Sequence, residues 1–141
     1  MQDDIVQFLC QKHIVSFTAE ADGEMWSASC FYVFDQKRQR LILLTSPQTR
    51  HSKLMLKNPR ISGTVINESC EVMKLQGIQF LGEITPLKTA EKPTALEQYY
   101  ARFPYARLMS STAWQIVLKE VKFTDNSAGF GHKTVWQCAE E

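Results

Sequence analysis

The stretch LILLTSPQTRHSK, residues 41–53, combines three features that decide the fold. Its first four residues form a short apolar run, which is typical of a strand buried on both faces. The residues TSPQT, 45–49, interrupt this run. Helical spacing then predicts a helix from Arg50 to Leu56, which Asn58-Pro59 must end. The sequence therefore predicts a strand, a tight turn and a short helix in direct succession.

On both sides of this stretch, β-branched and alternating segments predict further antiparallel strands. Residues 14–20 and 25–34 flank the turn signal Asp22-Gly23 and predict a hairpin. Together with the strand at 41–44, they predict three consecutive antiparallel strands. The remaining predicted strands cover 61–66, 72–84, 114–121 and 134–137, and further short helices cover 3–13 and 89–102. Six or seven strands with two or three short helices predict one domain over residues 1–141, mainly β, built as a closed antiparallel barrel with helices at its ends.

Length, charge and composition exclude several classes of protein. The chain has 141 residues, and 16 Lys+Arg against 15 Asp+Glu give a net charge of +1. This near-neutral balance argues against nucleic acid or an anionic membrane as the main partner. The acidic start Met1-Gln2-Asp3-Asp4 is unlike a signal peptide, and no apolar run reaches the ~18–20 residues of a spanning helix, which predicts a cytoplasmic protein. The four cysteines are widely spaced, which predicts buried or partly buried free thiols and no metal site.

The same decisive stretch predicts a local anion site. Backbone N–H groups at the start of a helix have no helical partner, and the helix dipole attracts negative charge there. Hydroxyl side chains add donors, and an arginine offers a bidentate fork for phosphate. The candidate residues are Thr45, Ser46, Thr49, Arg50, His51 and Lys53. On these residues alone, an ordinary solvated helix with a hydroxyl cap remains an open alternative.

Two motifs resemble the FMN-binding split-barrel superfamily, whose best known enzyme is pyridoxamine 5′-phosphate oxidase. The first is Thr45-x-x-x-Thr49-Arg50-His51, followed by NPRIS at 58–62, and the second is EQYYARFP at 97–104. The order of strands and helices matches over nearly the whole chain, and the C-terminal stretch 122–136 is most similar to the YhbP-like branch. The resemblance implies a six- to seven-stranded antiparallel split β-barrel that forms a homodimer, with the cofactor between the two subunits.

By position, the resemblance assigns Thr45, Thr49 and Arg50 to the phosphate of FMN. His51 stands where the family more often has lysine, and Lys53 is a candidate to replace that lysine. Because the flavin itself carries the redox chemistry, few catalytic side chains need be visible, and none is identified.

Other residues are candidates for contacts with the flavin ring. Trp26, Phe31 and Trp114 are candidate walls, with barrel core or dimer interface as the alternative for each. Gln79 is a candidate polar contact, with a solvent-facing side chain as its alternative. Phe130, between Gly129 and Gly131, lies in a loop that the resemblance places where it can close the site from the partner subunit, although a plain hairpin turn explains these glycines equally well.

The sequence also departs from the oxidase pattern. The early-strand arginine has no counterpart in residues 28–32, and the C-terminal Arg-x-His-x-Arg signature is absent, so pyridoxamine phosphate oxidation is not the predicted activity. The first hypothesis is an FMN-dependent oxidoreductase acting with NAD(P)H or a small-molecule redox substrate. The second is a non-enzymatic sensor or carrier that binds flavin, haem or another planar ligand, with His51 or His132 as the haem ligand.

Overall fold

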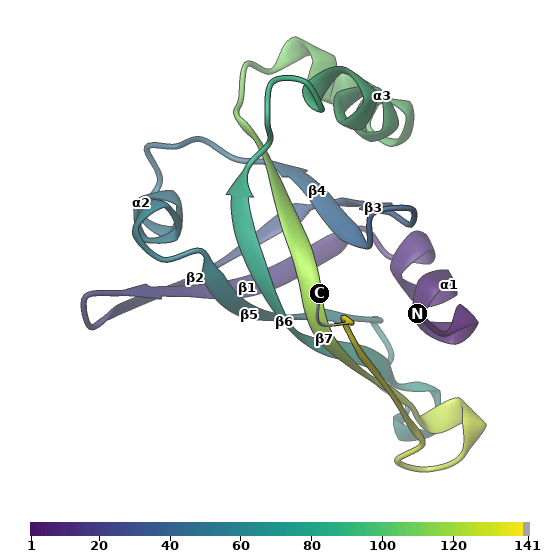
Figure 1. The fold of residues 1–141 in the computed structure, drawn as a ribbon. Coiled ribbons are helices and arrows are strands. Elements are labelled where there is room, and N and C mark those ends of the chain that lie inside the picture. The colour runs from purple at the N-terminus through teal and green to yellow at the C-terminus, as the bar shows by residue number, and fades with distance from the viewer. Residues whose placement is uncertain (140–141) are drawn as a thin grey trace.

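The computed structural model describes residues 1–139, which form eight strands and three α-helices (Figure 1). The order is α1 (Asp3–Gln11), β1 (Ile14–Ala21), β2 (Glu24–Phe31), β3 (Val33–Asp35), β4 (Arg40–Leu44), α2 (Arg50–Lys57), β5 (Arg60–Ile66), β6 (Gln76–Pro86), α3 (Lys92–Arg102), β7 (Ala113–Asp125) and β8 (Lys133–Gln137). Short 3-10 turns cover Val72–Lys74, Pro104–Leu108 and Asn126–Ala128. Within residues 1–139 no helix is long and apolar enough to cross a membrane.

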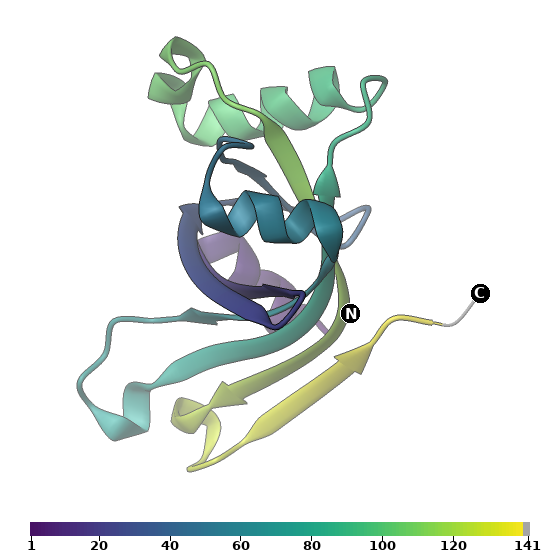
Figure 2. The same ribbon diagram turned by 90° about the vertical axis from the view of Figure 1, so that its left-hand side faces the viewer.

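All eight strands belong to one antiparallel sheet with the order β2-β1-β5-β6-β7-β4-β3, and β8 pairs with the far end of β7. The sheet curls strongly, and the three helices lie around it (Figures 1 and 2). This confirms the predicted mainly β architecture with short helices. Within residues 1–139 no strand pairing joins β2 to β3, so the sheet is curled but is not the closed barrel that was predicted. The strands at the two ends of the order, β2 and β3, are neighbours in the chain, so the sheet curves back toward its own beginning.

The predicted strand over 25–34 is wrong as a single element, because it is interrupted at Tyr32. The half before Tyr32 pairs with β1, whereas the half after it pairs with β4. Tyr32 is fully buried at this break, where its hydroxyl donates to the Leu9 carbonyl over 2.8 Å and its backbone N–H donates to His13 over 3.0 Å. The three predicted consecutive strands therefore divide between the two ends of the sheet order.

The core lies inside the curled sheet and is filled by alternate residues of each strand. In β1, for example, Val15, Phe17 and Ala19 point inward and are buried. The helix α1 closes one side of this core with three buried residues, Ile5, Phe8 and Leu9. Alternation with a period of two is what places these apolar side chains on one face of the sheet.

Two further strand boundaries differ from the prediction. β6 begins at Gln76 rather than Val72, because Val72–Lys74 form a 3-10 turn that the Asn126 side chain holds by donating to the Val72 carbonyl over 2.8 Å. β7 is longer than predicted because it pairs with β4 near its start and β8 near its end. The register of β6 and β7 shifts between Leu81 and Gly82, whereas Gly77 stays in register.

A buried ion-pair network attaches the start of α3 to the barrel. Arg40 of β4 is only 4% exposed, and its Nε donates to Asp35 over 3.0 Å. Its Nη1 donates to Glu91 over 2.9 Å and to Gln115 over 2.8 Å. A charged arginine is tolerated at this depth because its carboxylate and amide partners replace water.

The prediction for the cysteines is only partly correct. All four are free thiols, but Cys10, Cys70 and Cys138 are exposed, and Cys30 alone is half-buried.

Candidate functional site

The predicted anion site lies where β4 ends and α2 begins. The backbone of Thr45 is held on both sides, because its N–H donates to the Thr112 carbonyl over 3.0 Å and its carbonyl accepts from Trp114 Nε1 over 2.9 Å. The helix α2 packs against β1 and β2 across the curled sheet (Figures 1 and 2). Its buried residues Leu54 and Met55 fix its orientation, so its N-terminus stays next to Thr45.

Thr49 caps the start of α2, and this cap determines which backbone N–H groups of the first helical turn remain without a partner. Its Oγ1 accepts from the Ser52 N–H over 3.2 Å, and its backbone N–H donates to the Ser46 carbonyl over 3.3 Å. The backbone N–H groups of Arg50 and His51 have no hydrogen-bond partner within residues 1–139. Two donors at the positive end of the helix dipole are therefore available to an anion.

Arg50 is stacked on an aromatic side chain of the neighbouring hairpin. Its guanidinium carbon lies 4.1 Å from the centroid of the Trp26 ring, and Trp26 is 46% exposed. Stacking occupies the face of a guanidinium and leaves the N–H groups at its edge free. Arg50 makes no ion pair with any residue of the described chain 1–139, and neither does the exposed Lys53. Both cations are therefore available to a negative ligand.

His51 is turned toward the protein rather than toward solvent. Its Nε2 lies 2.8 Å from Thr45 Oγ1 and 3.1 Å from Thr49 Oγ1, and its ring meets the edge of Phe17 at 5.9 Å. Burial lowers the pKa of His51 below its ordinary value, which favours the neutral ring at pH 7. In this position the ring nitrogen faces the two threonines of the turn.

The remaining candidates divide between core and other surfaces. Trp114 is 0% exposed and belongs to the barrel core, which favours the core alternative over a wall of the site. Phe31 is half-exposed at the other end of β2, where it packs against His13 and Phe103. Trp114 reaches the turn only through its indole N–H, which donates to the Thr45 carbonyl, whereas the aromatic partners of Phe31 lie away from α2 and the turn before it.

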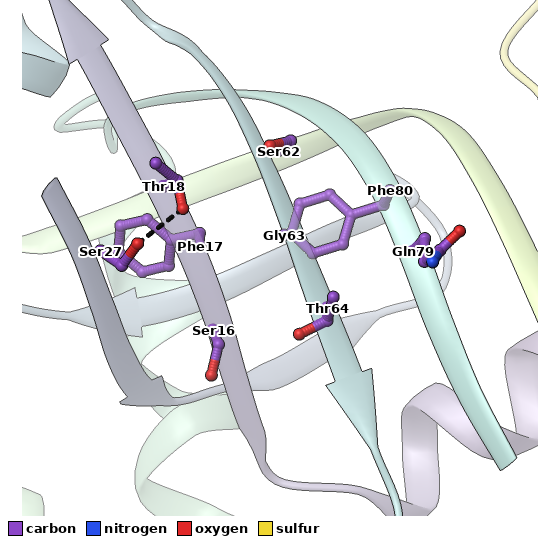
Figure 3. Close-up of a pocket in the computed structure, with 9 residues that line it drawn as sticks. All are labelled: Ser16, Phe17, Thr18, Ser27, Ser62, Gly63, Thr64, Gln79 and Phe80. Atoms are coloured by element: carbon purple, nitrogen blue, oxygen red, sulfur yellow. Dashed lines mark hydrogen bonds between the residues drawn. The ribbon is translucent and has the colours of Figure 1, made fainter. Parts of the chain in front are cut away.

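Gln79 is exposed on the outer face of β6, where it lines a shallow groove of about 320 Å³ (Figure 3). The groove is rich in hydroxyl side chains from β1, β2 and β5, and no residue of the turn 45–49 or of α2 lines it. Phe130 is 76% exposed in the turn before β8, at the opposite end of the sheet from α2 (Figures 1 and 2). A single chain therefore brings together the candidates of residues 45–53 but not Gln79 or Phe130.

Sequence reasoning missed two features of this region. Ser52 is fully buried and takes part in the cap, which the hydroxyl three residues after Thr49 could have indicated. The outer face of the β1–β2 hairpin carries two hydroxyl pairs, Ser16 with Ser29 at 2.8 Å and Thr18 with Ser27 at 2.7 Å. Alternating serine and threonine in paired strands is a signal for such pairs.

Comparison with solved structures defines the class of protein. A haem-binding protein from Mycobacterium smegmatis matches with a TM-score of 0.78 at 13% identity over 97% of this chain, which spans 59% of that chain. A FAD-binding protein from Mesorhizobium loti matches with a TM-score of 0.72 at 13% identity, over 87% of this chain and 94% of that one. HutZ, the haem storage protein from Vibrio cholerae, matches with a TM-score of 0.70 at 15% identity, over 84% and 89%. The chain is a split-barrel protein, as the resemblance implied.

Comparison with protein sequences then defines the family. No family model matches the chain. A UPF0306 protein of Yersinia pestis is 43% identical over 141 residues, which cover 98% of this chain and 96% of that protein. A UPF0306 protein of Yersinia pseudotuberculosis is 42% identical over the same share of both chains. The chain belongs to the UPF0306 family, and the predicted YhbP-like branch corresponds to it.

Proposed function

We propose that this protein binds FMN as a homodimer and carries out flavin-dependent redox chemistry with NAD(P)H or a small-molecule redox substrate. The observation that carries the proposal is the donor set at the start of α2. Two unpartnered backbone N–H groups, the stacked Arg50 guanidinium and the Thr45 hydroxyl lie within one short segment. This combination suits a phosphate group, which accepts hydrogen bonds and carries negative charge.

Each residue of the site has a distinct role in this proposal. Arg50 binds the phosphate through the edge of its guanidinium while Trp26 supports its face. Lys53, exposed one turn further along α2, adds positive charge. Thr45, Ser46 and Thr49 shape the turn and supply hydroxyl groups. When bound, FMN supplies the hydride or electron chemistry, and the chain provides binding, orientation and exclusion of water.

A second subunit is needed to complete the site. Trp26 and the start of α2 are open to solvent in a single chain, so nothing there encloses the flavin ring. Gln79 and Phe130 lie on surfaces away from α2, where they can reach a cofactor only if it is bound to another copy. The proposal therefore assigns these two contacts to the partner subunit and places the homodimer in the cytoplasm, where NAD(P)H is available.

FMN titration of the purified protein tests the proposal. We expect quenching of FMN fluorescence at micromolar protein, and an affinity at least about tenfold lower in Arg50→Ala, because a charge-assisted bond is lost. Lys57→Ala is the matched control, since Lys57 is a cation in the last turn of the same helix and pairs with Asp22. Failure of the wild type to bind FMN at tens of micromolar, or equal binding by Arg50→Ala, would refute it.

Reduction of the bound FMN by NADPH distinguishes an oxidoreductase from a non-enzymatic carrier. If the FMN-loaded protein is bleached by NADPH and reoxidised by an acceptor, it is an oxidoreductase. Binding without turnover supports the second candidate, a carrier of a planar ligand, which the haem-binding and haem-storage neighbours favour. In that case His132 is the better haem ligand, because Nε2 of His51 is already engaged by two threonines. Loss of the Soret band in His132→Ala and not in His51→Ala would identify it.

A further inference from the structure

The ring of His51 lies between two threonine hydroxyls, at 2.8 Å from Thr45 and 3.1 Å from Thr49. We propose that His51 is a positioning residue, whose Nε2–H donates to both oxygens and thereby leaves the Thr45 hydroxyl as an obligate hydrogen-bond donor to the ligand phosphate. This inference rests on the proposed function for the identity of the ligand. The assignment of protons to His51 and the two threonines depends only on distances within the protein.

The protons of the turn can be assigned from the heavy-atom distances. Ser52 Oγ lies 2.7 Å from the Ser46 carbonyl oxygen, which has no hydrogen, so Ser52 must donate. Thr49 Oγ1 lies 2.7 Å from Ser52 Oγ. Because Ser52 has already used its proton, Thr49 donates its own proton either to Ser52 or to the Ser46 carbonyl oxygen, which lies 3.1 Å from Thr49 Oγ1. Thr49 also accepts from the Ser52 backbone N–H over 3.2 Å, so it has no proton left for His51.

Nε2 of His51 must therefore carry a hydrogen. Two acceptor atoms facing each other at 3.1 Å would repel, and Thr49 can only accept at this contact. The same Nε2–H faces Thr45 Oγ1 at 2.8 Å, so Thr45 accepts there as well. In the neutral ring, the other nitrogen, Nδ1, is then unprotonated.

Thr45 retains one proton that no group of residues 1–139 accepts. Its backbone N–H and carbonyl are both engaged, by Thr112 and Trp114, and its side-chain oxygen accepts from His51. Thr45 is only 9% exposed, and within residues 1–139 its hydroxyl hydrogen has no acceptor. A nearly buried donor without an acceptor favours a ligand group that accepts only, which a phosphate dianion does. Ligand groups that must donate are disfavoured at this position.

The same geometry determines how acid affects the site. The titrating atom is Nδ1, so protonation adds a positive charge and leaves both bonds of Nε2–H in place. The groups that contact the His51 ring are Phe17 of β1, Thr45 and Thr49, and burial is the cause of its lowered pKa. The cations nearest to it in sequence are Arg50 and Lys53 of its own helix. A bound phosphate dianion favours the charged ring, so phosphate binding should raise the pKa of His51.

The nitrogen chemical shifts of ¹⁵N-histidine protein, recorded without ligand, test the arrangement directly. We expect His51 to show the pattern of a ring protonated at Nε2, with the exposed His13 and His132 as internal references. A pattern of protonation at Nδ1 overturns the inference, whether or not the protein binds FMN. Adding inorganic phosphate should then shift the His51 titration to higher pH, and a shift to lower pH contradicts the phosphate role.

Variants test the effect on the ligand. Thr45→Val removes the hydroxyl at constant shape, and His51→Leu removes the group that orients it. Each should lower FMN affinity about tenfold while leaving riboflavin, which lacks the phosphate, unaffected. His51→Gln, whose amide can donate from the position of Nε2, should restore most of the affinity.

The double variant distinguishes positioning from general support of the fold. If His51 acts through Thr45, His51→Leu should cause no further loss in the Thr45→Val background, because the hydroxyl it orients is absent. Independent, additive losses would overturn the inference. If the wild type binds no FMN and the ring is protonated at Nε2, the proposed function fails and the phosphate role fails with it, whereas the positioning of Thr45 stands.

Discussion

Gly63 is the residue of β5 at which a single methyl group should be most costly. It faces the interior between Phe17 of β1 and Phe80 of β6, which are its partners in register. The Phe80 ring lies next to Gly63 (Figure 3). A Cβ at Gly63 would lie 2.6 Å from this ring and would overlap the carbonyl oxygen of Ser16. The ring can turn by a small amount, but the carbonyl belongs to the backbone of a strand that is paired on both sides.

The expected cost follows from this backbone contact. Overpacking a core costs about 1–3 kcal/mol, and the upper end applies where the backbone must move. Replacing glycine by alanine also restricts the unfolded chain, which returns about 0.4–1 kcal/mol. Gly63→Ala should therefore lower the free energy of unfolding by about 2 kcal/mol. The matched control is Gly77→Ala on β6, where the nearest atom would be Ile66 Cγ1 at an ordinary 3.6 Å.

Urea denaturation followed by tryptophan fluorescence measures both variants. With a slope of about 1–3 kcal/mol per molar urea, the midpoint of Gly63→Ala should fall by about 1 M at unchanged slope. Gly77→Ala should unfold at the wild-type midpoint or slightly above it. A Gly63→Ala protein within about 0.5 kcal/mol of the wild type, or equal to Gly77→Ala, would show that β1 can yield and that the reasoning is wrong.

Three further outcomes are expected from the same assay. Arg40→Ala should lower the free energy of unfolding by about 3–5 kcal/mol, because it leaves the buried Asp35 carboxylate without its partner. Lys57→Ala removes an exposed ion pair and should lower it by less than about 1 kcal/mol. Similar losses in the two variants would contradict the stabilising role of the buried pair. Thr49→Ala should cost about 1 kcal/mol through loss of the helix cap, and Thr49→Ser should restore it; an undamaged Thr49→Ala would show that the cap contributes nothing. Folding lowers the pKa of His51, so as the pH falls the unfolded chain takes up a proton at this histidine before the folded chain does. The neutral, buried His51 therefore favours the folded state above about pH 6.5, and this stabilisation is lost as the pH falls below that value. The same pH dependence of the free energy of unfolding in His51→Gln would refute this.

The local features of the fold could be predicted from sequence. The strand, turn and helix of residues 41–57 were predicted within one or two residues, because an apolar run, a hydroxyl cap and Asn58-Pro59 are signals carried by neighbouring residues. The break at Tyr32 could not be predicted, since it exists only because the two halves of one extended segment pair with different strands. The length of β7 depends in the same way on its two partners at either end.

In the candidate site, too, local features could be predicted from sequence and long-range contacts could not. Thr45, Thr49 and Arg50 lie together because they are close in the chain. The contact between Trp26 and Arg50 requires the hairpin to fold against α2, and no local pattern indicates it. The place of Trp114 in the core follows from the alternation of β7, in which its side chain points inward. An aromatic residue on an inward position should therefore be read first as core.

There is a chemical reason why some contacts of the site come from one short segment whereas others require folding or association. A phosphate is compact, so its donors can come from one turn and the start of one helix, here the segment from Thr45 to Lys53. A flavin ring is broad and planar, so its contacts must come from surfaces that the chain brings together only by folding or by association. The segment proposed to bind phosphate lies within one chain, while Trp26 beside it remains half-exposed. The missing contacts are therefore those that only a second surface can supply.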